Sequence, residues 1–279
     1  TGTMAGVVQW DFENTTSDPC VDHWSGVYCF NASGLVCTGV EDCYVGELIL
    51  EYYDLRGTLN DDQFAELQTL NVLDFSHNEL YGTIPSSISS LGALQSFLLY
   101  QNDFNGSISE SIFTSDNLPK LLILSLDLNV LTGSIPTTIG DMTSLQVIGI
   151  HHNMLTGVLP SSMANLKNLE ALSLDINSIG GPIPEFLNGQ NFRNLTLLSM
   201  SNNRFSGSLP SSLASLSNLT ILYLSSNKLT GEIPQSFSSL KLLQYLSLAN
   251  NKQGRSPGLS GSLPDFLWTL TRLAYLRLQ

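Results

Sequence analysis

The sequence predicts an α/β solenoid, a curved, right-handed stack of coils with one parallel β-sheet on its concave face and a disulfide-stapled cap at its N-terminus. Three observations lead to this fold. A motif of the form N-x-(L/F)-x-G-x-(I/L) recurs along most of the chain with a period close to 24 residues. An L-x-x-L-x-L segment precedes each copy. All four cysteines lie near the N-terminus, before the first copy.

The cap comes first in the chain, and its cysteines are not spaced like zinc ligands. Two disulfides in an oxidising compartment fit better. Three pairings are possible, and we favour the neighbours, Cys20–Cys29 and Cys37–Cys43. Five N-x-(S/T) sequons agree with a secreted glycoprotein: Asn14, Asn31, Asn105, Asn194 and Asn218. We expect the cap to cover residues 1–45 and the repeats to cover residues 46–279.

The repeats follow as NELYGTIP, NDFNGSIS, NVLTGSIP, NMLTGVLP, NSIGGPIP, NRFSGSLP and NKLTGEIP. A degenerate copy precedes them at Gly57, and a copy with six inserted residues ends at Gly261. This period and pattern are typical of a leucine-rich repeat solenoid. We call each coil of the stack, with its one strand, a rung, and we expect about ten rungs, the last one incomplete.

Each rung contributes one short strand of the form x-L-x-L-x, whose leucines point inward. The asparagine that recurs in the motif, for example Asn153, turns the chain. Its side chain can hydrogen-bond backbone groups of the next coil, which would otherwise be buried without partners. Successive strands then stack into one parallel sheet, and neighbouring coils bury each other's apolar faces.

The motif L-x-G-x-(I/L)-P within a 24-residue coil resembles the plant-type extracellular leucine-rich repeat. That family includes receptor kinases, receptor-like proteins and polygalacturonase-inhibiting proteins, with relatives in algae and other protists. The segment SDPCVDHWSGVYC also resembles the family's N-terminal cap. The resemblance covers about residues 10–279. The second cysteine pair, the acidic first half and the insertion at 252–258 depart from the family pattern.

The resemblance implies that the non-leucine strand positions lie on the concave face, where partners bind. Two columns of side chains run along this face. The first column is the residue directly after the second inward-facing residue of each strand, and the second column is the residue after that. We expect the ligand-binding residues to be Tyr52, Asp74, His77, Tyr100, Asp127, His151, His152, Asp175, Tyr223 and Tyr245.

The two adjacent histidines lie within this set. His151 is 24 residues from both Asp127 and Asp175, and therefore one rung from each, at roughly 4.8 Å strand spacing. Three interpretations are open. The three residues form a solvated polar ladder, or the carboxylates raise the pKa of the histidine and create a pH-sensitive patch, or they hold a metal. We favour the first and predict no metal, no cofactor and no catalytic residue, since no nucleophile elbow or enclosed pocket is indicated.

Composition limits the partners. The net charge of −13 argues against nucleic acid. Residues 1–119 carry a charge of −16, and residues 120–279 carry +3. No apolar stretch approaches the roughly 18 residues of a membrane span. The sequence starts without an apolar leader and stops inside a strand, so we expect a removed signal peptide and either further chain or another molecule at the last coil.

Together these features predict an extracellular recognition module, secreted or at the cell surface, and not an enzyme. It would engage a peptide, protein or glycan through its concave face, like a receptor ectodomain. The alternative is a structural protein of the cell surface or extracellular matrix that self-associates head to tail, which the opposite charges of the two halves motivate. An inhibitor of cell-wall hydrolases is a third possibility, based on analogy alone.

Overall fold

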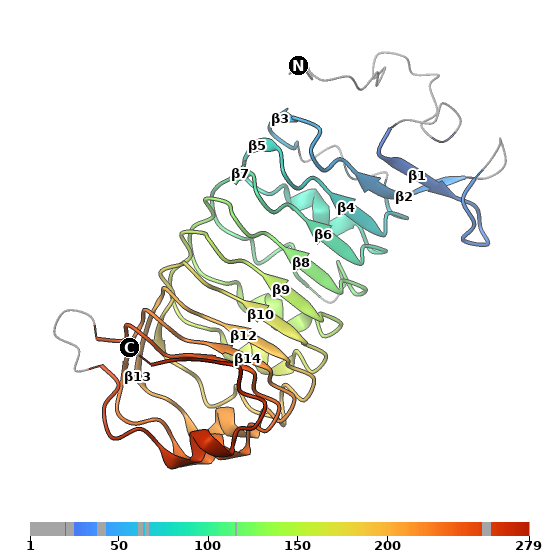
Figure 1. The fold of residues 1–279 in the computed structure, drawn as a ribbon. Coiled ribbons are helices and arrows are strands. Elements are labelled where there is room, and N and C mark those ends of the chain that lie inside the picture. The colour runs from blue at the N-terminus through green and yellow to red at the C-terminus, as the bar shows by residue number, and fades with distance from the viewer. Residues whose placement is uncertain are drawn as a thin grey trace.

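The computed structural model describes residues 20, 25–37, 43–60, 64, 67–114, 116–252 and 258–278. In this part of the chain, one 11-stranded sheet runs the length of the molecule (Figure 1). Its strands, in spatial order, are β1 (Val27–Phe30), β2 (Tyr44–Ile49), β4 (Val72–Asp74), β6 (Ser96–Leu98), β8 (Ile123–Ser125), β9 (Val147–Gly149), β10 (Ala171–Ser173), β12 (Leu197–Ser199), β14 (Ile221–Tyr223), β16 (Tyr245–Ser247) and β17 (Tyr275–Arg277).

The strand register follows the repeat. β1 and β2 pair antiparallel, whereas every later neighbour pairs parallel. Leu48 pairs with Leu73, which pairs with Phe97, and this continues rung by rung to Leu276. Because side chains alternate across a strand, this register places every central leucine inward and its two neighbours on the opposite, concave face. The predicted solenoid with its parallel sheet is confirmed.

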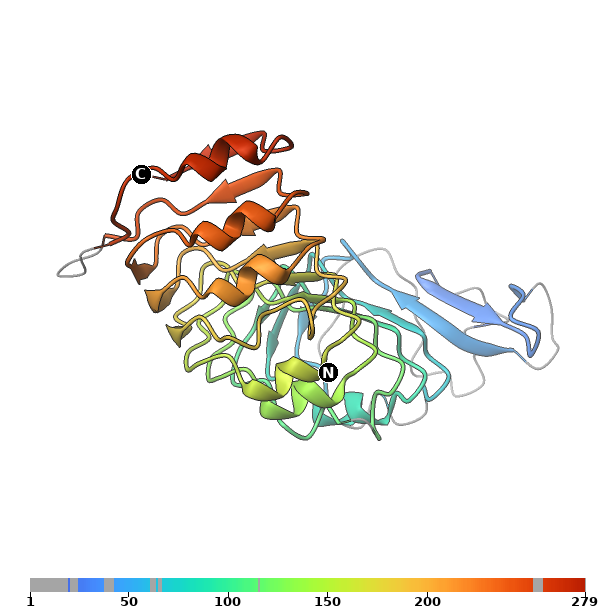
Figure 2. The same cartoon turned by 90° about the horizontal axis from the view of Figure 1, so that it is seen from below.

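The rest of each coil is turn-like. Two narrow sheets lie beside the main one, formed by β3 (Arg56–Gly57), β5 (Glu79–Gly82) and β7 (Asp103–Phe104), and by β11 (Gly180–Pro182), β13 (Arg204–Ser208) and β15 (Lys228–Thr230). Short 3₁₀ helices form a separate row along the stack (Figure 2): η2 (Ser86–Ser90), η3 (Thr137–Asp141), η4 (Ser161–Asn165), η5 (Ser211–Ser215), η6 (Gln235–Ser239) and η7 (Asp265–Thr269). The described residues contain no α-helix.

The motif proline explains where these 3₁₀ helices begin. In each of the six, a proline in extended conformation is the N-cap, as Pro160 is for η4. Proline fixes φ and lacks an N–H, so it suits the start of a helical turn and prevents the preceding strand from continuing.

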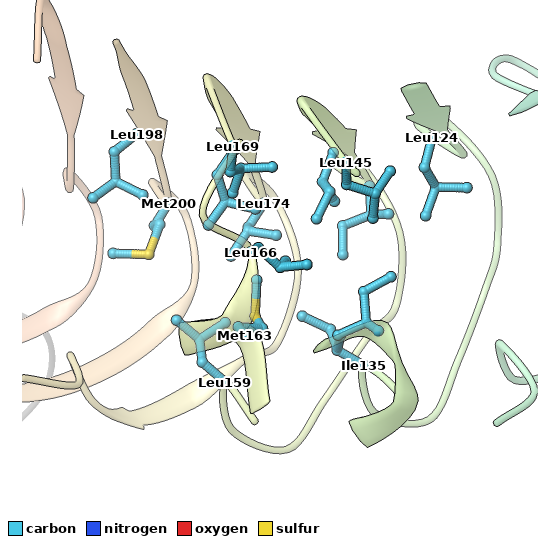
Figure 3. Close-up of a cluster of buried hydrophobic side chains, with 14 of the residues drawn as sticks. Leu124, Ile135, Leu145, Leu159, Met163, Leu166, Leu169, Leu174, Leu198 and Met200 are labelled. Atoms are coloured by element: carbon cyan, nitrogen blue, oxygen red, sulfur yellow. The ribbon is translucent and has the colours of Figure 1, made fainter. Parts of the chain in front are cut away.

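One apolar core fills the coils from end to end. Apolar residues on and next to the strands meet apolar residues of the 3₁₀ row inside the coil, as Leu169, two residues before β10, and Met163 of η4 do in Figure 3. Both are almost fully buried, as is Phe192. Burying one such side chain contributes about 1.5–3 kcal/mol, so each rung depends on its neighbours for its stability.

A ladder of buried asparagines closes the backbone between rungs. The Oδ1 atom of Asn153 accepts the N–H of Leu131 at 3.0 Å, and its Nδ2 atom donates to the carbonyl of Leu126 at 3.0 Å. Both partners belong to the preceding coil, so the expectation that this asparagine serves the next coil is wrong in direction. The coil of Asn153 is in turn bonded by the asparagine of the following coil, because the N–H of Leu155 donates to the Oδ1 atom of Asn177 at 2.9 Å.

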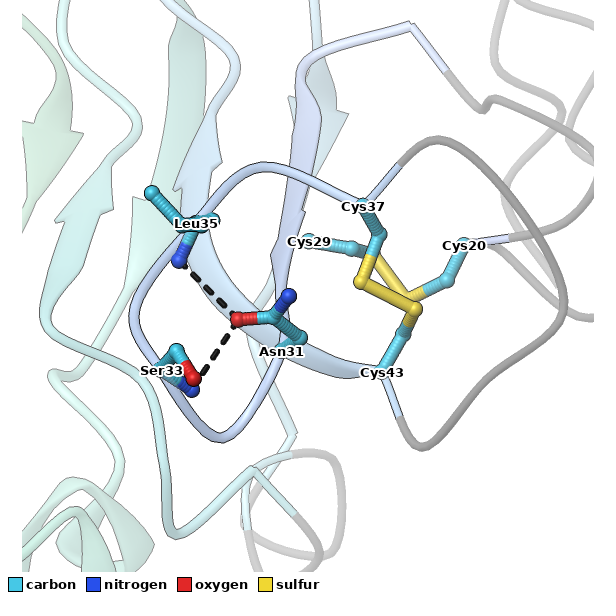
Figure 4. The surroundings of a disulfide bond; sticks show 7 residues. All are labelled: Cys20, Cys29, Asn31, Ser33, Leu35, Cys37 and Cys43. Carbon is cyan, nitrogen blue, oxygen red and sulfur yellow. Dashed lines mark hydrogen bonds between the residues drawn. A yellow bond between two sulfur atoms is a disulfide. The ribbon is translucent and has the colours of Figure 1, made fainter.

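The cap has the two predicted disulfides, Cys20–Cys29 and Cys37–Cys43 (Figure 4). The Oδ1 atom of Asn31 accepts the N–H groups of Ser33 and Leu35 and orders the turn after β1. The expected boundary between residues 45 and 46 falls inside β2.

Of the five sequon asparagines, Asn105, Asn194 and Asn218 are exposed and Asn31 is partly exposed, so all four lie where a glycan has room. Asn14 lies outside the described residues.

Candidate ligand-binding face

The concave face is acidic over its N-terminal half. The strand register places the carboxylates of Glu47 and Asp74 on this face. The first-column carboxylates, which follow β2, β8 and β10 after one intervening residue, lie on it as well: Glu51, Asp127 and Asp175. Among the described strand positions of the main sheet and the first column, Arg277 on β17 is the only lysine or arginine. A face with one sign of charge attracts partners of the opposite sign.

All ten predicted binding residues lie on or beside this face. Tyr100, Asp127, His151 and Asp175 occupy the first column of four consecutive rungs. The second column holds Tyr52, His77 and His152, and each of them has a positive φ. Asp74 and Tyr223 end their strands, and Tyr245 begins β16. Ligand binding by these residues stays a prediction.

The Asp127 carboxylate contacts both the backbone N–H and the imidazole ring of His151. Its Oδ1 atom accepts the N–H of His151 at 2.7 Å and lies 3.6 Å from the ring Nε2 atom. The hydroxyl of Ser125 donates to its Oδ2 atom at 2.8 Å. Burial raises the pKa of Asp127 above its ordinary value, although the neighbouring His151 and these hydrogen bonds oppose the rise.

The Asp175 carboxylate forms a hydrogen bond with the backbone of the following rung and not with His151. Its Oδ1 atom accepts the N–H of Ser201 at 2.7 Å, and its Oδ2 atom accepts the hydroxyl of Ser173 at 3.3 Å. The next two rungs repeat this arrangement, because Ser201 Oγ accepts the N–H of Ser225 and Ser225 Oγ accepts the N–H of Ala249, both at 3.1 Å. Asp127 and Asp175 therefore each accept a backbone N–H of the following rung, whereas the ring of His151 contacts His152 and not the N–H of Asp175. The solvated polar ladder and the pH-sensitive patch stay predictions.

The two adjacent histidines contact each other. The Nδ1 atoms of His151 and His152 lie 2.9 Å apart, so one ring donates to the other. The rings meet edge to face with centroids 5.1 Å apart. In the described part of the chain, no group of three or more His, Cys, Asp or Glu side chains is arranged to hold a metal ion.

A second aromatic cluster lies on the first three rungs. Tyr52 stacks on His77 with ring centroids 4.1 Å apart, and His77 meets the edge of Tyr100 at 4.8 Å. The Tyr100 hydroxyl donates to Glu51 Oε1 at 2.8 Å, and His77 Nε2 lies 3.8 Å from the same oxygen. Burial, followed by the hydrogen bond and charge of Glu51, raises the pKa of Tyr100 to about 12.

The sequence analysis did not include Glu51 among the binding residues. Its position in the first column could have indicated a place in the binding site, because the column aligns Glu51 with Tyr100. Nothing in the repeat pattern indicated that the tyrosine would reach across one complete rung to this carboxylate.

At the other end of the face, the rings of Tyr245 and Tyr275 lie 6.4 Å apart. Burial is the main cause that raises the pKa of the nearby Tyr223, and the two tyrosines and Asp175 add to it.

Comparison with known proteins identifies the repeats. Models described as leucine-rich repeat match residues 69–91, 144–166 and 193–252. A search of curated proteins finds no match to the chain.

Solved structures share the fold. The ectodomain of the membrane receptor kinase GASSHO1/SCHENGEN3 from Arabidopsis thaliana, in complex with Casparian strip integrity factor 2, is 34% identical, with a TM-score of 0.76, over 82% of this chain and 26% of its own. The Arabidopsis receptor kinase HAESA, in complex with the peptide hormone IDA and the co-receptor SERK1, is 30% identical, with a TM-score of 0.68, over 84% of this chain and 41% of its own. A leucine-rich repeat protein of Leptospira interrogans is 30% identical, with a TM-score of 0.64, over 77% of this chain and 50% of its own.

The chain thus has a leucine-rich repeat fold similar to plant receptor kinase ectodomains, and it spans about a quarter to a half of the length of these solved chains. Within the described residues, no helix is both long and apolar enough to cross a membrane.

Proposed function

We propose that this chain is an extracellular ligand-binding module, like a receptor ectodomain, that holds an extended basic peptide or protein segment on its concave face. The observation that carries the proposal is the pairing of exposed aromatic rings with carboxylates along one side of the sheet. Tyrosine gives large contact area at low entropic cost, and the carboxylates favour lysine and arginine in the partner.

Other features support an extracellular module. Both cysteine pairs are disulfide-bonded, which requires an oxidising compartment, and sequons lie at exposed positions. Similar ectodomains have been solved in complex with their ligands, HAESA with the peptide hormone IDA and the plant peptide hormone receptor RGFR1 with RGF2.

The test is a selection of displayed random peptides against the secreted, purified protein. We expect the selected peptides to be enriched in arginine and lysine, and their binding to weaken in Tyr52→Ala and Tyr223→Ala. The control is Trp268→Ala, which removes a ring that is 72% exposed on the 3₁₀ row. Selected peptides without basic enrichment, or equal loss of binding in the control, would contradict the proposal.

The same preparation tests the alternative function, head-to-tail self-association. Its motivation is the charge of −16 on residues 1–119 against +3 on residues 120–279. Linear particles that dissociate as salt is raised would favour a structural protein, because exposed charges are screened within about 3 Å at 1 M salt. A monomer at every salt concentration would remove that alternative.

A further inference from the structure

The cluster of Glu51, Tyr52, His77 and Tyr100 is fixed by contacts that span three rungs. Glu51 and Tyr100 belong to the first column of rungs one and three, and their hydrogen bond crosses the rung between them. That middle rung has Ser76 in the same column, and this serine is fully buried. A small residue there leaves room for the tyrosine to reach the carboxylate, so the rings are ordered before any ligand arrives.

Glu51 is the member of the cluster that can accept further hydrogen bonds from a ligand. Its Oε1 atom accepts the Tyr100 hydroxyl, whereas no described residue donates to its Oε2 atom, and the side chain is 33% exposed. Asp74 would be the competing carboxylate, but it is only 8% exposed and its Oδ1 atom accepts the N–H of Ser76. The accessible negative charge of this cluster is therefore that of Glu51.

The ring of Tyr52 gives this cluster an exposed apolar surface next to Glu51. It is 66% exposed although its ring stacks on His77 with an interplanar angle of only 15°. A large aromatic side chain that is both held in place and open to solvent loses little entropy when a ligand packs against it. It is also one residue from the carboxylate that can accept a donor.

We propose that these residues form a subsite for one arginine side chain of the partner. Its guanidinium would donate to Glu51, and its aliphatic stem and planar head would pack against the Tyr52 ring. The inference deepens the proposed function and rests on it. A guanidinium fits better than an ammonium, because it is planar, weakly hydrated and able to donate two parallel N–H groups to a carboxylate. The main-sheet strand and column positions of these three rungs, all of them described, include no lysine or arginine that would compete for Glu51.

The test is an NMR titration of the intact protein with N-acetylarginine methylamide, its lysine counterpart and its citrulline counterpart. Citrulline has nearly the shape of arginine without the charge. We expect the arginine probe to shift the ring signals of Tyr52 and His77, the lysine probe to bind more weakly, and the citrulline probe to leave both signals in place.

Two variants test whether the arginine probe contacts Glu51 and Tyr52. Glu51→Gln keeps an acceptor for Tyr100 but removes the charge, and Tyr52→Ala removes the apolar surface. Each should weaken the arginine probe roughly two- to fivefold, which is the range of an exposed charge pair or cation–π contact. Glu79→Gln and Tyr81→Ala are matched controls on β5, off the concave face, where both side chains are exposed. They should bind the probe like the unmodified protein.

Equal binding of the citrulline probe, or equal affinity of Glu51→Gln and Glu79→Gln, would overturn the inference. The probe needs no natural ligand, so the two proposals fail separately. If selected peptides bind the concave face while the arginine probe leaves the cluster unshifted, the subsite is wrong and the proposed function stands. If the probe binds the cluster but selected peptides bind elsewhere, the proposed function is wrong.

Discussion

Replacement of Asn227 by alanine tests the asparagine ladder, which joins the rungs. The side chain is fully buried. Its Oδ1 atom accepts the N–H of Phe205 at 3.0 Å, and its Nδ2 atom donates to the carbonyl of Met200 at 2.9 Å. Asn227→Ala leaves the N–H of Phe205 without this partner, whereas the carbonyl of Met200 keeps a hydrogen bond from the Nδ2 atom of Asn203 at 3.3 Å. One orphaned buried group costs about 1–3 kcal/mol, so we expect the free energy of unfolding to fall by about that amount.

The measurement is urea unfolding followed by circular dichroism at 25 °C. Asn168→Ala is the matched control, because that asparagine is exposed and makes one hydrogen bond, to the carbonyl of Thr143 at 2.9 Å. Water replaces that bond, so its loss should cost less than about 1.5 kcal/mol. A loss in Asn227→Ala no larger than that in the control would refute the claim that buried asparagines satisfy the backbone between coils.

Three further outcomes follow from the contacts. Because burial raises the pKa of Asp127 in the folded state, its ionisation costs stability as pH rises from the unfolded pKa through the folded one. Asp127→Asn should therefore gain stability relative to the unmodified protein between pH 4 and pH 7 in urea titrations, and an unchanged difference would contradict this. Glu51→Gln should lower the pKa of Tyr100 from about 12 in an ultraviolet titration compared with Tyr100→Phe, and an unchanged value would exclude the carboxylate as a cause. Removing the Cys20–Cys29 disulfide by replacing both residues with alanine should cost about 2–4 kcal/mol and expose the first coil to proteolysis, whereas mass mapping that found free thiols in the natural protein would refute the pairing.

The fold could be predicted because its determinants are local and repeated. Leucine spacing within one rung fixes which side chains face inward, and the 24-residue period fixes which residues lie side by side in the sheet. The glycine of the motif marks a turn, and in six coils the motif proline marks the start of a 3₁₀ helix, as Gly157 and Pro160 do. The second column was also predicted as a set, although not its left-handed backbone, which Ile176 adopts despite its branched side chain.

The contacts of the candidate site could not be predicted in the same way. Sequence spacing places His151 equally far from Asp127 and Asp175, because both are one period away. The strands are parallel, however, so the two sides of a rung are not equivalent. The N–H of His151 faces Asp127, and the carboxylate of Asp175 faces Ser201. The stacking of Tyr52 on His77 depends on side-chain rotamers that the repeat pattern does not encode.

The first column also explains why we place the proposed arginine subsite on the first rungs. From the fourth rung onward, polar residues such as Asp127 and Asp175 accept the backbone N–H of the following rung, so the framework alone explains their presence. Glu51 lies in the same column, but the N–H that it would accept belongs to Ser76 and is already bonded to Asp74. In the described part of the chain, Glu51 contacts side chains and no backbone N–H: it accepts the Tyr100 hydroxyl, and His77 lies 3.8 Å away. Because the backbone does not require this partly exposed carboxylate, we place the proposed cationic anchor of the ligand at the N-terminal end of the concave face.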